Sequence, residues 1–266
     1  SNRARRDFKH LLDYIIARWS HSPHILAWKL FTEIDLTGSR SGWYTNHQVT
    51  DWHREMARHL KLHDPNRHLV TTHWSGNYGK ARGSPQLAGL DELDFLTLDA
   101  YYSGHRGAQR LYNTLTATLS YQSQMEKPCI ITEFGGTPWA DSLPHVLQQF
   151  HLGLWKGYFG GFAIPPFLWW FPLVHEHDLY PEYNALAAFT RGETRRRATM
   201  VDTTLEDGLQ QCEIRRDRDR LVWIFDQNYH FHNDRLHLPA RSHNDLGIRL
   251  AGLKPGKYTA QFWNCS

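Results

Sequence analysis

The chain has 266 residues, of which 41% are hydrophobic and 21% charged, a composition that suits one barrel-sized domain or two smaller ones. A formal net charge of +3 is too small and too scattered to indicate a nucleic-acid partner. No run of about 18 apolar residues is present, so no membrane span is expected, and no signal peptide is recognisable. The aromatic share of 14%, with 11 Trp, suits either a Trp-rich core or a site for a flat apolar ligand face.

The three cysteines are too few for a disulfide framework. Cys129 lies in an apolar run and is expected to be a buried, free thiol. Cys212 and Cys265 are candidates for one disulfide in the C-terminal region.

Strands and helices are expected to alternate over the first 192 residues. Apolar residues in 6–19 follow the i, i+3, i+4 spacing of an amphipathic helix, and Thr50 or Asp51 is the expected N-cap of the second helix. The expected helices are 6–19, 49–62, 107–125, 143–157 and 181–189, and the expected strands are 24–34, 68–73, 93–101, 128–134 and 161–170. This alternation is typical of a parallel α/β sheet.

After Gly192 the pattern changes to strands without helical periodicity, at 212–230 and 246–263. We therefore expect two domains, an α/β domain over 1–192 and a small all-β, sandwich-like domain over 193–266. A complete (β/α)8 barrel takes about 250 residues, so five strand units in roughly 190 residues predict an open sheet or an incomplete barrel. An open parallel sheet exposes its edges, which favours a barrel whose first strands are missing from this chain.

Two glutamates, Glu33 and Glu133, stand at the ends of apolar runs that are expected to be strands. In parallel α/β folds, ligands bind at the C-terminal ends of the strands. Two carboxyl groups that meet there can cleave a glycosidic bond, because one protonates the leaving oxygen while the other attacks or activates water. A separation of about 5 Å gives retention, and one of about 6.5–9.5 Å gives inversion.

The sequence around both glutamates resembles clan A glycoside hydrolases, the retaining group that contains family 5 cellulases and mannanases. Residues 27–36 (AWKLFTEIDL) resemble the fourth-strand motif of that group, and 131–135 (ITEFG) resemble its seventh-strand motif. Residues 52–56, 64–68 and 99–101 resemble the fifth and sixth units, and 160–170 the eighth strand. The resemblance implies an N-terminally incomplete (β/α)8 TIM barrel that contains strands four to eight.

The same resemblance implies roles for individual residues. Glu33 would be the acid/base and Glu133 the nucleophile, with Tyr101 donating a hydrogen bond to the nucleophile. Trp169 or Trp170 would form the floor of the sugar subsite, because an aromatic face packs against the C–H groups of a sugar. Trp74, at the exit of the strand expected at 68–73, is a further substrate-binding candidate.

Two positions depart from the family pattern. Thr32 stands immediately before Glu33, where the family has an Asn that binds the sugar 2-hydroxyl. Asp99 stands two residues before Tyr101, where the family has His, and a third carboxyl group there would alter the coupling between the glutamates. We count Thr32 and Asp99 among the expected substrate-binding residues.

The expected function is that of a retaining glycoside hydrolase acting on a β-linked polysaccharide or oligosaccharide by double displacement. The alternative is a catalytically weakened or inactive carbohydrate-binding relative, which Thr32 and Asp99 favour. A metal hydrolase is a third interpretation, but the pairs in 175–177 (HEH) and 230–232 (HFH) lack the i, i+4 spacing of a helical zinc site. No glycine-rich phosphate loop is present, which argues against a nucleotide-binding protein.

No cofactor and no metal are expected. The expected partners are a carbohydrate substrate and either the missing N-terminal part of the barrel or a second copy of the chain, with no nucleic acid and no membrane. The expected location, secreted or periplasmic, follows only from the expected function.

Overall fold

The computed structural model describes residues 1–38, 42–75, 84–101, 107–123, 126–136, 142–226, 231–232, 236–237 and 242–265. Two compact units make up the chain, Ser1–Ala100 with Ala117–Thr132, and Tyr101–Thr116 with Glu133–Ser266. The boundary between the units passes through β4 (Leu96–Tyr101), α4 (Gly107–Ser123) and β5 (Cys129–Gly135). The domain boundary expected at residue 192 stays a prediction.

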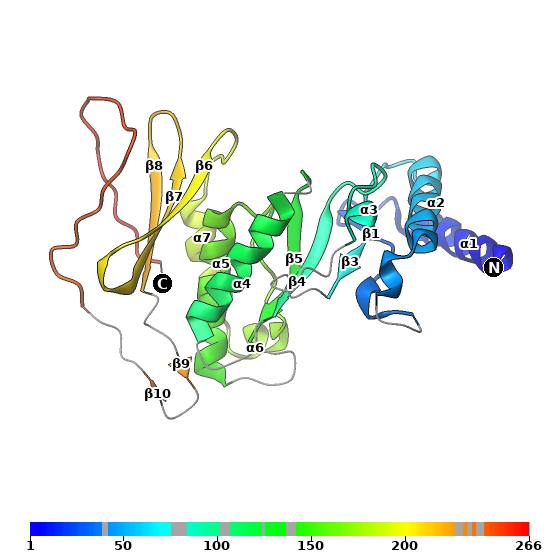
Figure 1. Ribbon diagram of the computed structural model, residues 1–266, viewed down its shortest axis with the longest axis horizontal. Coiled ribbons are helices and arrows are strands. Elements are labelled where there is room, and N and C mark those ends of the chain that lie inside the picture. Colours follow the sequence, from blue (N-terminus) through cyan, green and yellow to red (C-terminus); the bar gives the residue numbers. More distant parts are fainter. Residues whose placement is uncertain are drawn as a thin grey trace. The chain divides into compact units, whose positions relative to one another are not determined.

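Two helices of the first unit, α1 (Asn2–Trp19) and α2 (His47–His63), pack side by side (Figure 1). Both were expected from their apolar periodicity, and their inner faces bury Leu12 and Ile16 of α1 and Met56 and Leu60 of α2. The predicted N-cap of α2 was wrong, because the cap is Asn46, whose side chain accepts a hydrogen bond from the Gln48 N–H. Asn caps a helix as well as Asp or Ser does. The helix can therefore begin at His47, about one turn before the first residues of its apolar face.

The strands of the first unit are short and form parallel pairs. β1 (Ala27–Lys29) pairs with β2 (Leu69–Thr71), and β3 (His73–Trp74) pairs with β4, in a sheet of order β3-β4-β5. The chain leaves β1 well before the expected strand end at 34 and forms two 3₁₀ turns, η1 (Ile34–Leu36) and η2 (Trp43–Thr45). A one-turn helix, α3 (Pro85–Ala88), precedes β4 and was not expected.

The second unit is built around α5 (Leu143–Gly160), which buries most of its residues. The helices α6 (Phe171–Glu176) and α7 (Tyr180–Phe189) follow it. The strand expected at 161–170 is reduced to a single parallel bridge between Phe134 and Leu168. Residues 165–166 are consecutive prolines, and proline has no N–H to donate to a sheet ladder, which explains the loss of the strand.

An antiparallel sheet follows, shown in yellow and orange in Figure 1. Its strands are β6 (Thr199–Thr204), β7 (Leu209–Arg215) and β8 (Arg220–Asp226), with the turn η4 (Glu206–Gly208) between the first two. β6 was not recognised in the sequence. A short antiparallel pair, β9 (Phe231–His232) and β10 (Leu236–His237), comes next.

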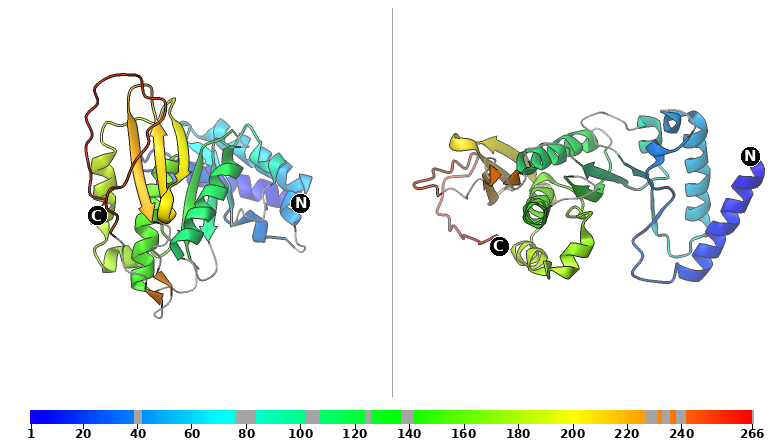
Figure 2. Two further views of the ribbon diagram at one scale, coloured as in Figure 1. Left: turned by 60° about the vertical axis from the view of Figure 1, so that its left-hand side comes forward. Right: turned by 90° about the horizontal axis from the view of Figure 1, so that it is seen from below.

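The strand expected at 246–263 is absent. Residues 242–265 contain no helix or strand and run as an irregular loop in Figure 2. A strand needs a neighbouring edge to complete its backbone hydrogen bonds, and no described strand pairs with this segment. The sandwich expected for the C-terminal region therefore stays a prediction, while the α/β alternation before it is confirmed as far as α5 and fails at 161–170.

Aromatic rings form the core of the second unit. The ring centroids of Trp155 and Phe159 on α5 lie 5.3 and 6.0 Å from the ring centroid of Phe189 on α7. The Phe159 centroid lies 6.1 Å from that of Trp223 on β8. Much of the high aromatic content therefore serves packing rather than ligand binding.

All three cysteines are free. The disulfide considered between Cys212 and Cys265 is therefore wrong, and Cys129 is buried as expected. Burial raises the pKa of the Cys129 thiol, which makes this cysteine unreactive.

Candidate active site

Glu33 lies in the loop that follows β1 in the first unit. Its backbone has left-handed dihedral angles, φ 51° and ψ 53°, and it caps η1. Non-glycine residues rarely adopt this conformation, and it persists only when the surroundings hold it.

Two links hold this loop against the end of β3. The Glu33 N–H donates to Nδ1 of His73 at 3.0 Å. Asp35 accepts from the Ser75 N–H at 2.8 Å and from the Ser75 hydroxyl at 2.7 Å. The position of the Glu33 backbone is therefore fixed by residues about 40 positions later in the chain.

His73 connects Glu33 to a buried carboxyl group. Nδ1 of His73 accepts the Glu33 N–H, so the ring proton is on Nε2, which donates to Asp99 Oδ1 at 2.7 Å. The side chains of His73 and Asp99 are both 0% exposed. This arrangement assigns a neutral imidazole with a defined tautomer.

Asp99 is a carboxyl group in an unusual environment. Burial raises its pKa, the hydrogen bond from His73 opposes that rise, and the charge of Glu33 adds to it. Carboxylate oxygens of Glu33 and Asp99 lie within 4.8 Å of each other. Oδ2 of Asp99 is buried and accepts no hydrogen bond from the described residues.

Glu133 lies on β5, in the second unit. The Tyr101 hydroxyl donates to Glu133 Oε2 at 2.8 Å. The Tyr101 ring meets the Trp169 ring edge-on, with 6.5 Å between centroids. The backbone N–H of Trp169 donates to the backbone oxygen of Phe134, the residue directly after Glu133. The second unit thus brings Tyr101, Glu133 and Trp169 together.

The other expected residues differ in exposure. Thr32 is exposed beside the half-buried Glu33. Trp170 is half-buried, and a β carbon added to Gly135 would lie 3.9 Å from its ring. Trp74 is only 2% exposed, so its ring faces are covered by protein and offer no surface to a sugar.

Sequence reasoning did not assign a role to His73 or to the link between Asp35 and Ser75. His73 and Ser75 lie at or just beyond the end of an expected strand, where polar side chains indicate a site in parallel α/β folds. That position was the signal available in the sequence, whereas the pairing with Asp99 was not.

The histidine pairs considered for a metal hydrolase do not form such a site in the described residues. Nδ1 of His175 lies 3.1 Å from the Tyr180 hydroxyl, and neither His175 nor His177 joins a cluster of metal-ligand geometry. His230 lies outside the described residues.

No helix among the described residues is both long enough and apolar enough to cross a bilayer. No protein-family model and no curated protein sequence match the chain.

Similar solved structures include two mannanases and a glucuronidase. The endo-β-1,4-mannanase from Thermotoga petrophila is 16% identical with a TM-score of 0.48, over 81% of this chain and 58% of that protein. The endo-1,4-β-mannanase from Rhizomucor miehei is 18% identical with a TM-score of 0.47, over 61% and 51%. The β-glucuronidase from Ruminococcus gnavus is 17% identical with a TM-score of 0.45, over 62% and 29%. The chain thus spans a little over half the length of the two mannanases.

Proposed function

We propose that this chain is part of a retaining glycoside hydrolase for a β-linked oligosaccharide or polysaccharide, with Glu133 as nucleophile and Glu33 as acid/base. The observation that carries the proposal is the hydrogen bond from the Tyr101 hydroxyl to Glu133 Oε2 at 2.8 Å. A nucleophilic carboxylate must stay ionised and must hold one orientation. A phenol donor on one oxygen favours the ionised form and holds the carboxylate in one orientation.

The reaction would proceed in two displacements. In the first, a Glu133 oxygen bonds to the anomeric carbon while the glycosidic C–O bond breaks, and Glu33 gives its proton to the leaving oxygen. In the second, a water molecule attacks the anomeric carbon, Glu33 takes its proton, and the bond between Glu133 and the sugar breaks. Trp169, whose ring contacts that of Tyr101, and Trp170, whose ring lies near Gly135, would supply aromatic surface for the sugar.

The first unit contributes a fixed acid/base. A general acid must be held in place, since catalysis falls steeply with small errors in geometry. The hydrogen bond from the Glu33 N–H to His73 and the link between Asp35 and Ser75 restrain the loop on both sides of the Glu33 side chain. An enzyme that acts on polysaccharides works where those polymers are, so the proposal implies export from the cell.

A covalent label tests the nucleophile directly. The full-length protein is incubated with a panel of 2-deoxy-2-fluoro-β-glycosyl fluorides that differ in the sugar, and the peptides are mapped by mass spectrometry. The proposal expects a label on Glu133 in the wild type and no label in Glu133→Gln. It also expects the wild type to turn over the matching aryl β-glycoside, and this turnover should be lost in both Glu133→Gln and Glu33→Gln. Turnover that survives either substitution, or a label on another carboxyl group, overturns the assignment.

Tyr101→Phe serves as the graded variant. A hydrogen bond to a charged group contributes about 1.5–3 kcal/mol, so kcat/KM should fall roughly 10- to 100-fold with the label still on Glu133. An unchanged kcat/KM would remove the observation on which the assignment of Glu133 rests.

A carbohydrate-binding protein without turnover is the second candidate, and Thr32 is the observation that favours it. Its side chain is exposed beside Glu33 but has no amide to bind a sugar 2-hydroxyl. Under the enzyme proposal, Thr32→Asn should raise kcat, because that contact strengthens in the transition state. Calorimetric binding of an oligosaccharide, with no turnover in the parent or in Thr32→Asn, would decide for the binding protein.

A further inference from the structure

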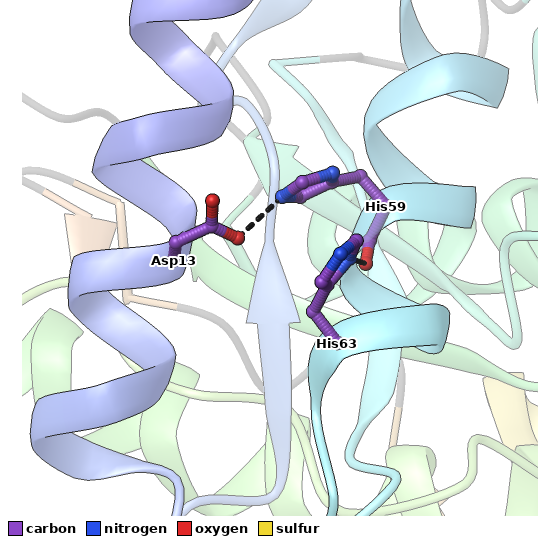
Figure 3. Close-up of side chains that lie close together, drawn as sticks. All are labelled: Asp13, His59 and His63. Atoms are coloured by element: carbon purple, nitrogen blue, oxygen red, sulfur yellow. Dashed lines mark hydrogen bonds and ion pairs between the residues drawn. The ribbon is translucent and has the colours of Figure 1, made fainter.

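The two packed helices of the first unit carry a cluster of metal-ligating side chains. His59 and His63 are four residues apart on α2, so both imidazoles project from one face of that helix. Asp13 faces them from α1 (Figure 3). One ligand atom from each of the three side chains lies within 4.8 Å of the other two.

From this geometry we infer that Asp13, His59 and His63 form a binding site for one divalent transition-metal ion of the zinc type. The site lies between α1 and α2 and shares no residue with the proposed active site. It therefore stands or falls independently of the glycosidase proposal.

The hydrogen bonds of the cluster orient both rings, and that of His63 leaves a lone pair for a metal. Nδ1 of His63 lies 2.9 Å from the backbone oxygen of His59 and donates its proton there, which leaves the lone pair on Nε2. Metal-ligating histidines commonly donate their other ring N–H to a carbonyl in this way. Nε2 of His59 lies 2.6 Å from Asp13 Oδ1, so these two ligand atoms already face each other at the place where an ion would bind.

The spacing requires only small movements. Ligand atoms bound to zinc at about 2.0–2.2 Å lie roughly 3.3 Å from one another in a tetrahedron. The contact between His59 and Asp13 would widen and the His59 ring proton would move from Nε2 to Nδ1, which keeps the ring neutral and frees the Nε2 lone pair. The His63 ring, whose centroid lies 4.1 Å from that of the stacked His59 ring, would turn toward the ion. His63 is exposed, so it turns at little cost and leaves an entry path and a position for water.

Charge also favours a cation here. Two neutral imidazoles and one carboxylate carry a net charge of −1. A bound divalent ion would bring the net charge of the site to +1. The nearby cations Arg5 and Lys9 both pair with Glu55, one turn before His59 on α2, so Glu55 offsets one of their two positive charges. The mixed set of nitrogen and oxygen ligands suits Zn²⁺, Co²⁺, Ni²⁺ or Cu²⁺, whereas Mg²⁺ and Ca²⁺ prefer oxygen alone.

The test is a titration of the metal-free protein with Co²⁺, followed by visible absorption, and with Zn²⁺, followed by calorimetry. We expect one equivalent of Co²⁺ to give the d–d bands of a four- or five-coordinate ion. Zn²⁺ should displace it, and millimolar Mg²⁺ should not. His63→Ala and Asp13→Asn should each weaken affinity at least 10-fold, and His21→Ala, an exposed histidine outside both helices, should leave affinity unchanged.

The variants separate a metal site from a simple hydrogen bond between helices. His63 is exposed and its bond lies within its own helix, so His63→Ala should leave the circular dichroism spectrum and Tm of the metal-free protein unchanged. Loss of the Co²⁺ bands in that folded variant supports the site. Equal Co²⁺ affinity in wild type, His63→Ala and Asp13→Asn, or no one-equivalent binding in wild type, overturns it and leaves only the hydrogen bond between Asp13 and His59.

Discussion

The buried pair of His73 and Asp99 gives a stability prediction that can be worked out from the structure. Both side chains are fully buried, and Nε2 of His73 supplies the only described hydrogen bond to the Asp99 carboxyl group. His73→Phe keeps a ring of similar shape but leaves that carboxyl group without a donor. Leaving a buried polar group without its hydrogen bond costs about 1–3 kcal/mol and more for a charged group, so we expect a loss of at least about 3 kcal/mol at pH 8.

Asp99→Asn should cost much less than His73→Phe. The Asn carbonyl can still accept from Nε2 of His73, and the substitution removes a charge whose burial is unfavourable. The new amide replaces Oδ2, which has no described partner, so an unsatisfied donor takes the place of an unsatisfied acceptor. We expect a loss of at most about 1–3 kcal/mol.

The pH dependence follows from the raised pKa of Asp99. The native state holds the Asp99 proton to a higher pH than the unfolded state, so between the two pKa values it binds more protons. Stability from this group is therefore greatest at low pH and falls as pH rises through the native pKa. His73→Phe removes the hydrogen bond that opposes the rise, so the fall should extend to higher pH, whereas Asp99→Asn should abolish it.

The assay is urea unfolding at pH 5 and pH 8, followed by far-UV circular dichroism, with equal m-values as the check that the same structure unfolds. A His73→Phe protein within about 1 kcal/mol of wild type at pH 8 would refute the reasoning, because it would mean that the buried carboxyl group does not need its donor. So would an Asp99→Asn protein that is less stable than His73→Phe.

Two further predictions concern the packing of the second unit. Lys156 is buried on α5 and pairs with the partly exposed Asp202. Asp202→Ala leaves the buried ammonium without its partner and should lower the free energy of unfolding by up to about 3–5 kcal/mol, whereas Lys156→Met should lower it by less than about 1.5 kcal/mol. Urea unfolding measures both, and the reverse order would contradict this. A β carbon added to Gly153 would lie 2.3 Å from the Phe134 ring, so Gly153→Ala should lower stability by about 1–3 kcal/mol although Ala favours helix. Gly247→Ala, with no atom within 4 Å of its β carbon, is the matched control, and equal effects of the two glycine substitutions would refute the clash.

The sequence by itself determined the elements whose residues repeat with a regular period. α1 and α2 appear where apolar residues recur every three or four positions, because that spacing places them on one face of a helix. β4 and β5 appear as short apolar runs. Tyr101 stands at the C-terminal end of β4, and Glu133 stands near the C-terminal end of β5. These features depend on neighbours within a few residues, so they can be predicted directly from the sequence.

Tertiary structure decided what depends on distant partners. The segment 246–263 has the composition of a strand but finds no described edge to pair with, and 161–170 keeps a single bridge to Phe134. His73 gains its tautomer and its place beside Glu33 from Asp99, 26 residues later in the chain. A hydrogen bond between buried groups forms only after packing excludes water and brings both atoms within about 3 Å, and no local pattern of residues encodes that meeting.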